Sequence, residues 1–195
     1  MAHKPSLEHK PSRLAMAVNG RPRISQTFST PDAPFFGNAI TYSLTNLAAQ
    51  TLAASDQTPV RAFAEICNHI AESQSSSIIN SRHIAEVYTL ADRVESGSLF
   101  VGWDLFGSRD LTITSWADFD LYGVDFGKVI GRPRFVRLPY MEADGVAIIL
   151  PRQRWVCQEV MEVIVMLRRD HIEALELDPM WQTLGSAGSG VHPVG

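Results

Sequence analysis

The sequence predicts an α/β fold in which two amphipathic helices pack on one sheet, and three observations support this prediction. Apolar residues recur at helical spacing in residues 59–73 and 80–95. From Leu111 onward the pattern changes to short runs of strand-forming residues. The chain has 195 residues, 45% of them hydrophobic, which is enough for one domain with its own core.

The two ends of the chain differ in composition from the middle. Residues 1–12 repeat the tetrapeptide His-Lys-Pro-Ser and show no apolar periodicity, so we expect a disordered leader. Its paired histidines lack further converging ligands, so we expect no metal site. The folded domain is then residues 13–184, and the Gly/Ser-rich residues 185–195 form a flexible tail.

Two strands are predicted before the helices. The first covers residues 13–19 and ends at Gly20. The second covers residues 35–44 and places Ile40, Tyr42 and Leu44 on one face.

Each helix has a start signal and an apolar stripe. Thr58 and Pro59 supply an N-cap and a first-turn proline for the first helix. Its predicted inward stripe is Val60, Phe63, Ala64, Cys67, Ile70 and Ala71. The predicted inward residues of the second helix are Ile84, Val87, Tyr88, Ala91 and Val94.

The C-terminal part predicts a hairpin and a last helix. Residues 145–150 and 159–167 are apolar runs joined by a short connection, so we expect an antiparallel pair. The second run is apolar on both faces, which is typical of a central strand. Asp170 and Glu173 fit a capping box for a short helix that stops at Asp178.

The segment from Leu111 to Trp116 is the most informative one for chemistry. Alternation along a strand places Thr112, Thr114 and Trp116 on one face. Two hydroxyls and an indole could line a cleft that holds a carbonyl group and an organic substrate. An ordinary strand, with threonine for β-propensity and tryptophan for packing, explains the same pattern.

Composition and missing motifs exclude several classes of function. The net charge is −4 and no basic face is clustered, so nucleic acid is not an expected partner. No apolar run is long enough to span a membrane, and two cysteines fit a reduced, cytoplasmic setting. Asp125-Phe126-Gly127 lacks the other protein-kinase motifs, and no nucleophile elbow or dinucleotide fingerprint is present.

Five segments occur in the order found in one known family. They are Ala17–Arg23, Phe35–Asn38, Thr114–Trp116, Asp125–Gly127 and Glu162–Val163. Together they resemble the C-terminal half of the BAHD-type plant and fungal acyl-CoA-dependent acyltransferases, and the fungal trichothecene 3-O-acetyltransferase branch is the most similar. The resemblance covers roughly residues 13 to 177.

The resemblance implies a chloramphenicol-acetyltransferase-like domain with a mixed sheet and flanking helices. It implies an enzyme of secondary metabolism that transfers an acyl group from acyl-CoA, such as acetyl-CoA, to a small-molecule alcohol or amine. Acyl-CoA is then a co-substrate, and no cofactor is expected to stay bound. The family's general base is a histidine in a His-x-x-x-Asp motif, which does not occur in this sequence.

The resemblance also implies roles for individual residues. Thr114 would contact the thioester carbonyl or the oxyanion, and Trp116 and Asn38 would bind substrate. Asp125 would be a buried structural residue that pairs with Arg21 or, as second choice, Arg23. Gly127 would adopt a positive φ in the turn.

Two functions follow from these expectations. In the first, the chain is the CoA-side domain of an O-acyltransferase. This domain is inactive alone, and its partner is either a missing N-terminal catalytic half or a second copy of the chain. The alternative is a non-catalytic domain, left from a truncated acyltransferase, that binds CoA or another protein.

Overall fold

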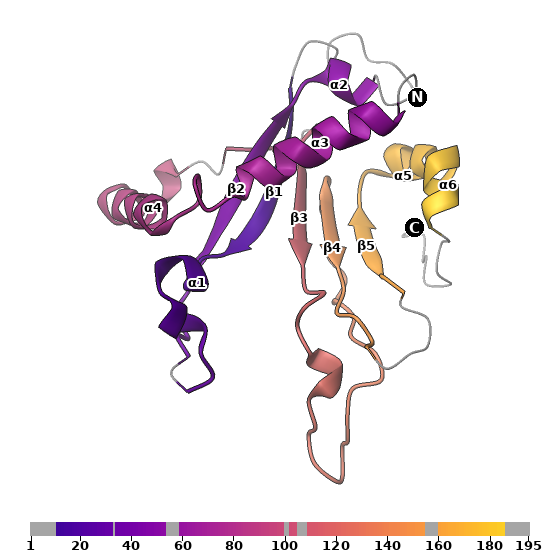
Figure 1. Cartoon of the computed structure of the whole chain (residues 1–195). Coiled ribbons are helices and arrows are strands. Elements are labelled where there is room, and N and C mark those ends of the chain that lie inside the picture. Colours follow the sequence, from indigo (N-terminus) through magenta and orange to yellow (C-terminus); the bar gives the residue numbers. More distant parts are fainter. Residues whose placement is uncertain are drawn as a thin grey trace.

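The computed structural model describes residues 11–32, 34–53, 59–99, 102–104, 109–154 and 160–185. These residues form a mixed five-stranded sheet with helices on one face and at its margins (Figure 1), so the predicted α/β class is confirmed. Residues 1–10 of the expected leader 1–12 and the expected tail from residue 186 lie outside the described residues, but Ser12 already begins the first strand, so the expected leader extends too far.

The strand order in the sheet is β2-β1-β3-β4-β5. The strands are β1 (Ser12–Asn19), β2 (Ile40–Leu47), β3 (Leu111–Ser115), β4 (Val146–Ile149) and β5 (Val163–Met166). The pairs β1/β2 and β4/β5 are antiparallel, whereas β1/β3 and β3/β4 are parallel. The predicted C-terminal hairpin is therefore confirmed.

Neighbouring strands of the sheet pair over different lengths. β1 and β2 pair over eight consecutive positions, but β1 and β3 pair only where Leu14, Ala15 and Met16 lie beside residues 111–113. Beyond these three positions the two strands diverge toward their C-terminal ends (Figure 1). The β1–β2 pair thus forms a wing that leaves the rest of the sheet at the end where Ser115 lies.

Both predicted helices are present, as α3 (Pro59–Ser73) and α4 (Ser81–Arg93). The predicted inward stripe of α3 is wrong, because Val60 and Phe63 are exposed. The helix instead turns buried Ala62 toward the sheet, and the hydroxyl of Ser73 accepts a hydrogen bond from Thr45 at 2.8 Å. The faces of β2 follow from this contact, since the hydroxyl-bearing residues Thr41, Ser43 and Thr45 are buried and Ile40, Tyr42 and Leu44 are exposed.

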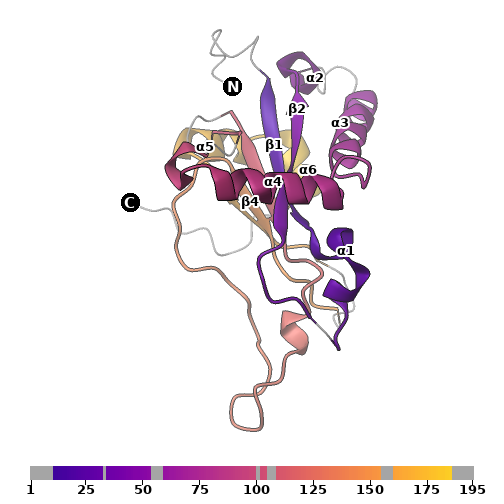
Figure 2. The ribbon, with the colours of Figure 1, turned by 90° about the vertical axis from the view of Figure 1, so that its left-hand side faces the viewer.

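Helix α4 lies across the β2 side of the sheet (Figure 2). Asn80 caps it by accepting from the main-chain nitrogen of His83. Only Ile84 of its predicted inward residues is buried, in a cluster with Val18 and Ile79. The rest of the predicted α4 stripe is exposed or, at Val94, half-buried.

Four further expectations differ from the structure. β2 begins at Ile40 rather than at residue 35, and β5 is an edge strand rather than a central one. The predicted capping box is absent, because Asp170 lies within the first turn of α5 (Arg169–Glu176) and pairs with Arg168. The helix α5 does stop before Asp178, as predicted, but it is not the last helix, because the Asp178 carboxylate caps α6 (Pro179–Leu184).

The remaining helical segments are short connections. They are α1 (Arg21–Ile24), α2 (Ala49–Ala53) and the single 3-10 turns Gln26–Ser29, Ser96–Ser98 and Leu121–Gly123. Across the described ranges, none of the helices combines the length and apolarity that crossing a bilayer requires.

Candidate functional site

The C-terminal end of β3 carries the residues that the sequence singled out. Thr112 and Thr114 lie beside Val146 and Ile148 of β4, so all four side chains share one face of the sheet. The main-chain nitrogen of Trp116 donates to the Ile149 carbonyl at 2.8 Å, which extends the ladder by one residue. Because the ladder continues to Trp116, alternation remains the reason to expect its side chain on the Thr114 face.

The site lies at the open end of the sheet. Thr114 and Trp116 are each half-buried, and they follow the last residue of β3 that pairs with β1. The hydroxyl and the indole therefore border the region where β1 and β3 diverge. An oxygen-bearing ligand at this end could accept from Thr114 while its apolar part contacts Trp116.

A charged cluster surrounds the turn that follows Trp116. Arg152 pairs with Asp118 at 2.7 Å and also donates through Nε to the Ala117 carbonyl at 3.4 Å. Arg154 lies 3.7 Å from the same Asp118 carboxylate. Two guanidinium groups thus share one carboxylate beside the site. Nothing in the sequence spacing of these arginines indicates that they meet Asp118.

Two buried polar atoms lie on or against the Thr114 face and have no hydrogen-bond partner among the described residues. They are Thr112 Oγ1 and Trp103 Nε1. Trp103 is 7% exposed, and its ring lies 5.0 Å from that of Tyr42 on β2. Trp103 precedes β3 in a segment whose residues show neither strand nor helix periodicity, so this packing could not be predicted from local patterns.

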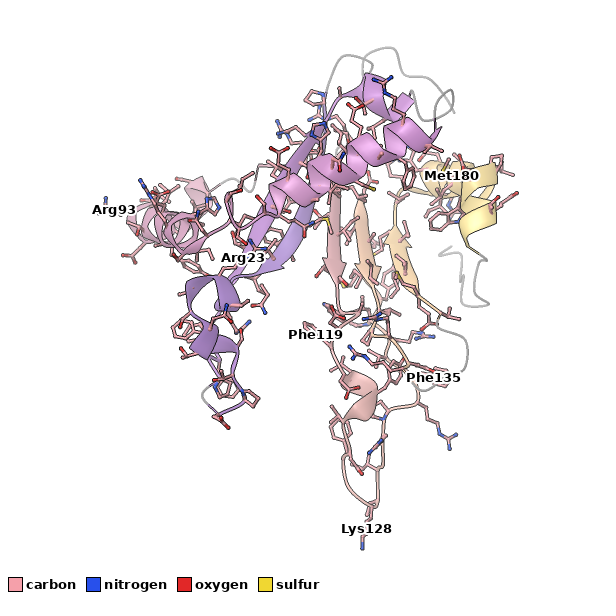
Figure 3. The ribbon with its side chains drawn as sticks, viewed as in Figure 1. Arg23, Arg93, Phe119, Lys128, Phe135 and Met180 are labelled. Atoms are coloured by element: carbon pink, nitrogen blue, oxygen red, sulfur yellow. The ribbon has the colours of Figure 1, made fainter. Side chains whose placement is uncertain are left out.

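The segment after Trp116 projects away from the sheet as an extended arm, residues 117–143 (Figures 1 and 3). Its one fully buried anchor is Tyr122, which is 1% exposed and whose hydroxyl accepts from the main-chain nitrogen of Val136 at 3.3 Å. At the tip, Gly127 has φ +87° as expected, and Gly131 has φ +76°. The arm's large apolar side chains that are exposed are Phe119, Val124, Phe126, Val129, Ile130, Phe135, Tyr140 and Met141.

The expected position of Asp125 is wrong for this structure. Asp125 is exposed, and its carboxylate accepts from the main-chain nitrogen of Gly127 at 2.8 Å within the arm's turn. A two-residue contact of this kind is an Asx turn, which needs no arginine. The resemblance supplied the expected pair, but the arm that carries Asp125 extends away from the arginines.

The two candidate arginines bind main-chain oxygens instead. Arg21 donates to the carbonyls of Phe35 and Gly37 at 2.8 and 2.9 Å. Arg23 donates to the carbonyls of Ile79 and Gln74 at 2.8 and 2.7 Å. Both arginines therefore have a structural role, as expected, but they bind main-chain carbonyls rather than the Asp125 carboxylate. Main-chain acceptors leave no trace in side-chain composition, which is why the sequence did not indicate them.

Asn38 lies at the same end of the sheet as Trp116. Its side-chain oxygen accepts from the Ile40 nitrogen at 3.0 Å, and its carbonyl accepts from the Tyr88 hydroxyl at 2.9 Å. β1 stands between the two positions, and the wing carries Asn38 away from β3. The structure thus keeps Thr114 and Trp116 at one end of β3 and leaves Asn38 beyond β1, on the diverging side.

No imidazole reaches Thr114 through a hydrogen bond within the described part of the chain. His69 and His83 lie beside β2, and His171 lies on α5. The described residues also contain no group of three or more His, Cys, Asp or Glu side chains that could hold a metal ion. Among the described residues, no histidine is thus placed to act as a general base at Thr114.

Comparisons with known proteins place this geometry in context. Residues 1–180 match the family described as the transferase family. The trichothecene 8-O-acetyltransferase of Fusarium sporotrichioides is 29% identical over 184 residues, which are 86% of this chain and 37% of that protein. The O-acetyltransferase ptmV of Penicillium ochrochloron is 32% identical over 103 residues, 53% of this chain and 20% of that protein.

Solved structures show the same fold. The apo F. graminearum TRI101 structure matches with a TM-score of 0.71 and 19% identity over 90% of this chain and 37% of that one. F. sporotrichioides TRI101 complexed with coenzyme A and T-2 matches with a TM-score of 0.68 and 18% identity over 89% of this chain and 40% of that one. The chain thus spans about two fifths or less of the length of these proteins.

Proposed function

Because the chain belongs to the BAHD-type transferase family, we propose that it is the CoA-side part of an acyl-CoA-dependent O-acyltransferase and that it does no chemistry alone. The observation that carries this proposal is the shared face of Thr114 and Trp116 at the open end of β3. Acyl-CoA is the co-substrate. The acceptor is a small-molecule alcohol or amine of secondary metabolism.

Thr114 is assigned to the carbonyl of the thioester. When a nucleophile attacks that carbonyl, its oxygen gains negative charge, and the Thr114 hydroxyl can donate to it. One donor aimed at such an oxyanion contributes about 3 kcal/mol to transition-state stabilisation. Trp116 offers an apolar wall for the acceptor, and Asn38 is assigned to substrate binding on the diverging side.

The general base has to come from outside these residues. Deprotonating an alcohol at neutral pH normally requires a positioned histidine, which contributes about 10²–10⁴-fold in rate. The 195 residues contain no His-x-x-x-Asp motif. We therefore assign the base to a second domain or protein that carries the histidine and completes the site.

The exposed arm supports association with such a body. Val129 is 98% exposed and Ile130 75% exposed at its tip, and Phe135 is 72% exposed further along. Large apolar side chains that gather on an extension of a chain mark a surface for another protein. The arm begins directly after Trp116, so a body that covers it also reaches the candidate site.

Isothermal titration of the purified chain with acetyl-CoA, whose thioester carbonyl is the group assigned to Thr114, tests the assignment of the site. We expect binding by the parent chain and about fivefold weaker binding, or ~1 kcal/mol, for Thr114→Val, because one hydrogen bond to the carbonyl is lost. Thr112→Val on the same strand is the matched control, and it should bind as the parent does. Equal affinity for all three chains would reject the assignment of Thr114 to the thioester.

A second candidate function is a domain that binds CoA or a protein without any catalysis. The missing motif and the exposed arm favour it. Binding of acetyl-CoA that depends on Thr114, with no acyl transfer even when a histidine-bearing half is added, would select this second function over the first.

A further inference from the structure

One segment of the arm, residues 126–141, carries a charge opposite to that of the rest of the chain. It contains four basic side chains, Lys128, Arg132, Arg134 and Arg137, and no acidic one. The whole chain has a net charge of −4, so the residues outside this basic segment together carry −8. A surface of negative potential therefore attracts the basic segment and repels the rest of the chain, which selects one orientation of approach.

Three of these four cations have no acidic partner within the part of the chain that the structure describes. Lys128, Arg132 and Arg134 are exposed and form neither an ion pair nor a side-chain hydrogen bond there. Arg137 differs, because it pairs with Glu162 at 2.9 Å. The three free cations can therefore form charge-assisted hydrogen bonds with carboxylates of another molecule.

The turn at the end of the arm is held in one shape by its own main chain. The Phe126 nitrogen donates to the Gly131 carbonyl at 2.9 Å, and the Gly131 nitrogen donates to the Gly127 carbonyl at 2.7 Å. This turn places Lys128 at the far end of the arm (Figure 3), next to Val129, which is 98% exposed. A preformed turn loses less conformational entropy on binding than a flexible one, so it is suited to docking.

We propose that the basic segment docks on an acidic surface of the domain or protein that supplies the histidine. Val129 and Ile130 enter an apolar pocket of that surface. Carboxylates around the pocket pair with Lys128, Arg132 and Arg134. This inference rests on the proposed function and adds the chemistry by which the partner is recognised.

The lengths of the relatives support a protein as the occupant. The chain spans 37% of the Fusarium sporotrichioides trichothecene 8-O-acetyltransferase and 37% of the apo F. graminearum TRI101 chain. About three fifths of each relative therefore lies outside the matched part. The arm begins directly after Trp116, so a domain seated on the arm also borders the candidate site.

Charge reversal tests the docking. Fluorescence anisotropy measures binding of the labelled chain to a separately produced fragment of a fungal relative that carries the His-x-x-x-Asp motif. At about 0.05 M salt, Lys128→Glu/Arg134→Glu should bind about tenfold more weakly than the parent, because two attractions become repulsions. The difference should shrink at about 0.5 M salt, where ions screen exposed charges.

The matched control changes the net charge by the same amount elsewhere. Arg61→Glu/Arg93→Glu replaces two exposed cations on α3 and α4, and Arg93 lies away from the arm (Figure 3). This control should bind within about twofold of the parent, since only its long-range field differs. Equal weakening of both double variants would show that net charge acts rather than the arm, and it would overturn the inference.

The apolar part of the arm is tested by a third variant. Val129→Ser/Ile130→Ser should also bind about tenfold more weakly, because it removes apolar area that the pocket would bury. Its loss should be similar at both salt concentrations, since apolar burial is not screened by ions. Parent-like affinity of this variant would contradict the assigned pocket.

Acyl transfer in the same mixtures, at saturating fragment, tests the proposed function separately. Transfer together with parent-like affinity of Lys128→Glu/Arg134→Glu overturns the inference and leaves the function intact. Charge-dependent binding without transfer supports the inference and rejects the function. A parent chain that does not bind the fragment overturns the inference. So does an arm-dependent association of the chain with itself or with phosphatidylserine vesicles that exceeds its affinity for the fragment.

Discussion

The carboxylate of Asp110 accepts a hydrogen bond from the main-chain nitrogen of Arg13 at 3.0 Å and joins the start of β1 to the start of β3. Its second oxygen accepts from the Asp104 nitrogen at 2.9 Å, and Arg109 lies 3.5 Å away. The Asp110 side chain is fully buried. One carboxylate thus holds three chain segments at the only place where β1 and β3 pair.

Replacing Asp110 should destabilise the chain strongly. Asp110→Ala removes the fully buried carboxylate that accepts from two part-buried main-chain nitrogens, and we expect a loss of about 2–3 kcal/mol in the free energy of unfolding. Asp118→Ala is the control, because that carboxylate is 83% exposed and an exposed pair contributes less than about 1 kcal/mol. Urea unfolding of both variants measures the difference, and equal midpoints would show that Asp110 does not join the strands.

Replacing Gly127 should destabilise the chain more than replacing Asp125. A buried ion pair at Asp125 would give the reverse order. Asp125→Ala removes only an exposed Asx turn, so we expect a loss below about 1 kcal/mol. Gly127→Ala forces an alanine into φ +87°, which costs about 1–2 kcal/mol. Thermal unfolding should rank the glycine variant as the less stable one. A much larger loss for Asp125→Ala would mean that Asp125 has a buried partner.

Asp125 is exposed instead of pairing with Arg21 or Arg23, and this difference shows what local sequence patterns do not predict. Apolar periodicity and turn residues predicted the α/β class, the two long helices and the C-terminal hairpin, because these signals act locally. Strand alternation is local in the same way, and it is the basis for expecting Thr114 and Trp116 on one face. The partners of Arg21 and Arg23 are main-chain carbonyls, which depend on how distant segments meet.

The helix stripes show a different limit. Periodicity correctly located α3 and α4, but Phe63 and Val87 are exposed. On α3 the small residue Ala62 is buried instead, and the polar residue Ser73 contacts the hydroxyl-bearing side of β2 through Thr45. An apolar stripe predicts that one face of a helix is covered, but it does not predict what packs against that face.

The stability of the chain should depend on pH through Asp170. Partial desolvation raises the pKa of this carboxyl, but the charge and hydrogen bonds of Arg168 outweigh it, so the pKa lies below the ordinary value of 3.8. Because the folded-state pKa is the lower one, the contribution is present above about pH 4 and is lost as the pH falls through the folded-state pKa.

Urea unfolding of the parent chain and of Asp170→Asn from pH 7 to pH 2 measures this effect. The parent should be the more stable chain at neutral pH, and the difference should vanish at the acid end. Asp170 is exposed, so the difference should be small. A constant difference across the whole range would assign the effect to something other than ionisation.

Thr114 should matter for the chemical step rather than for folding. In the assembled enzyme, Thr114→Val should lower kcat by about 10²-fold, since one oxyanion donor is lost while shape is kept. Thr114→Ser keeps the hydroxyl and should recover most of that loss. Thr112→Val, on the same strand face, is the matched control. Similar losses in the two valine variants would assign the effect to packing.

Thiol release from acetyl-CoA tests the central claim most directly. The purified chain is incubated with acetyl-CoA and a trichothecene alcohol, alone and with a separately produced fragment of a fungal relative that carries the His-x-x-x-Asp motif. We predict release at the background rate for the chain alone and faster release in the mixture, which Thr114→Val reduces. Release by the chain alone that disappears when one of its own histidines is replaced would contradict the account.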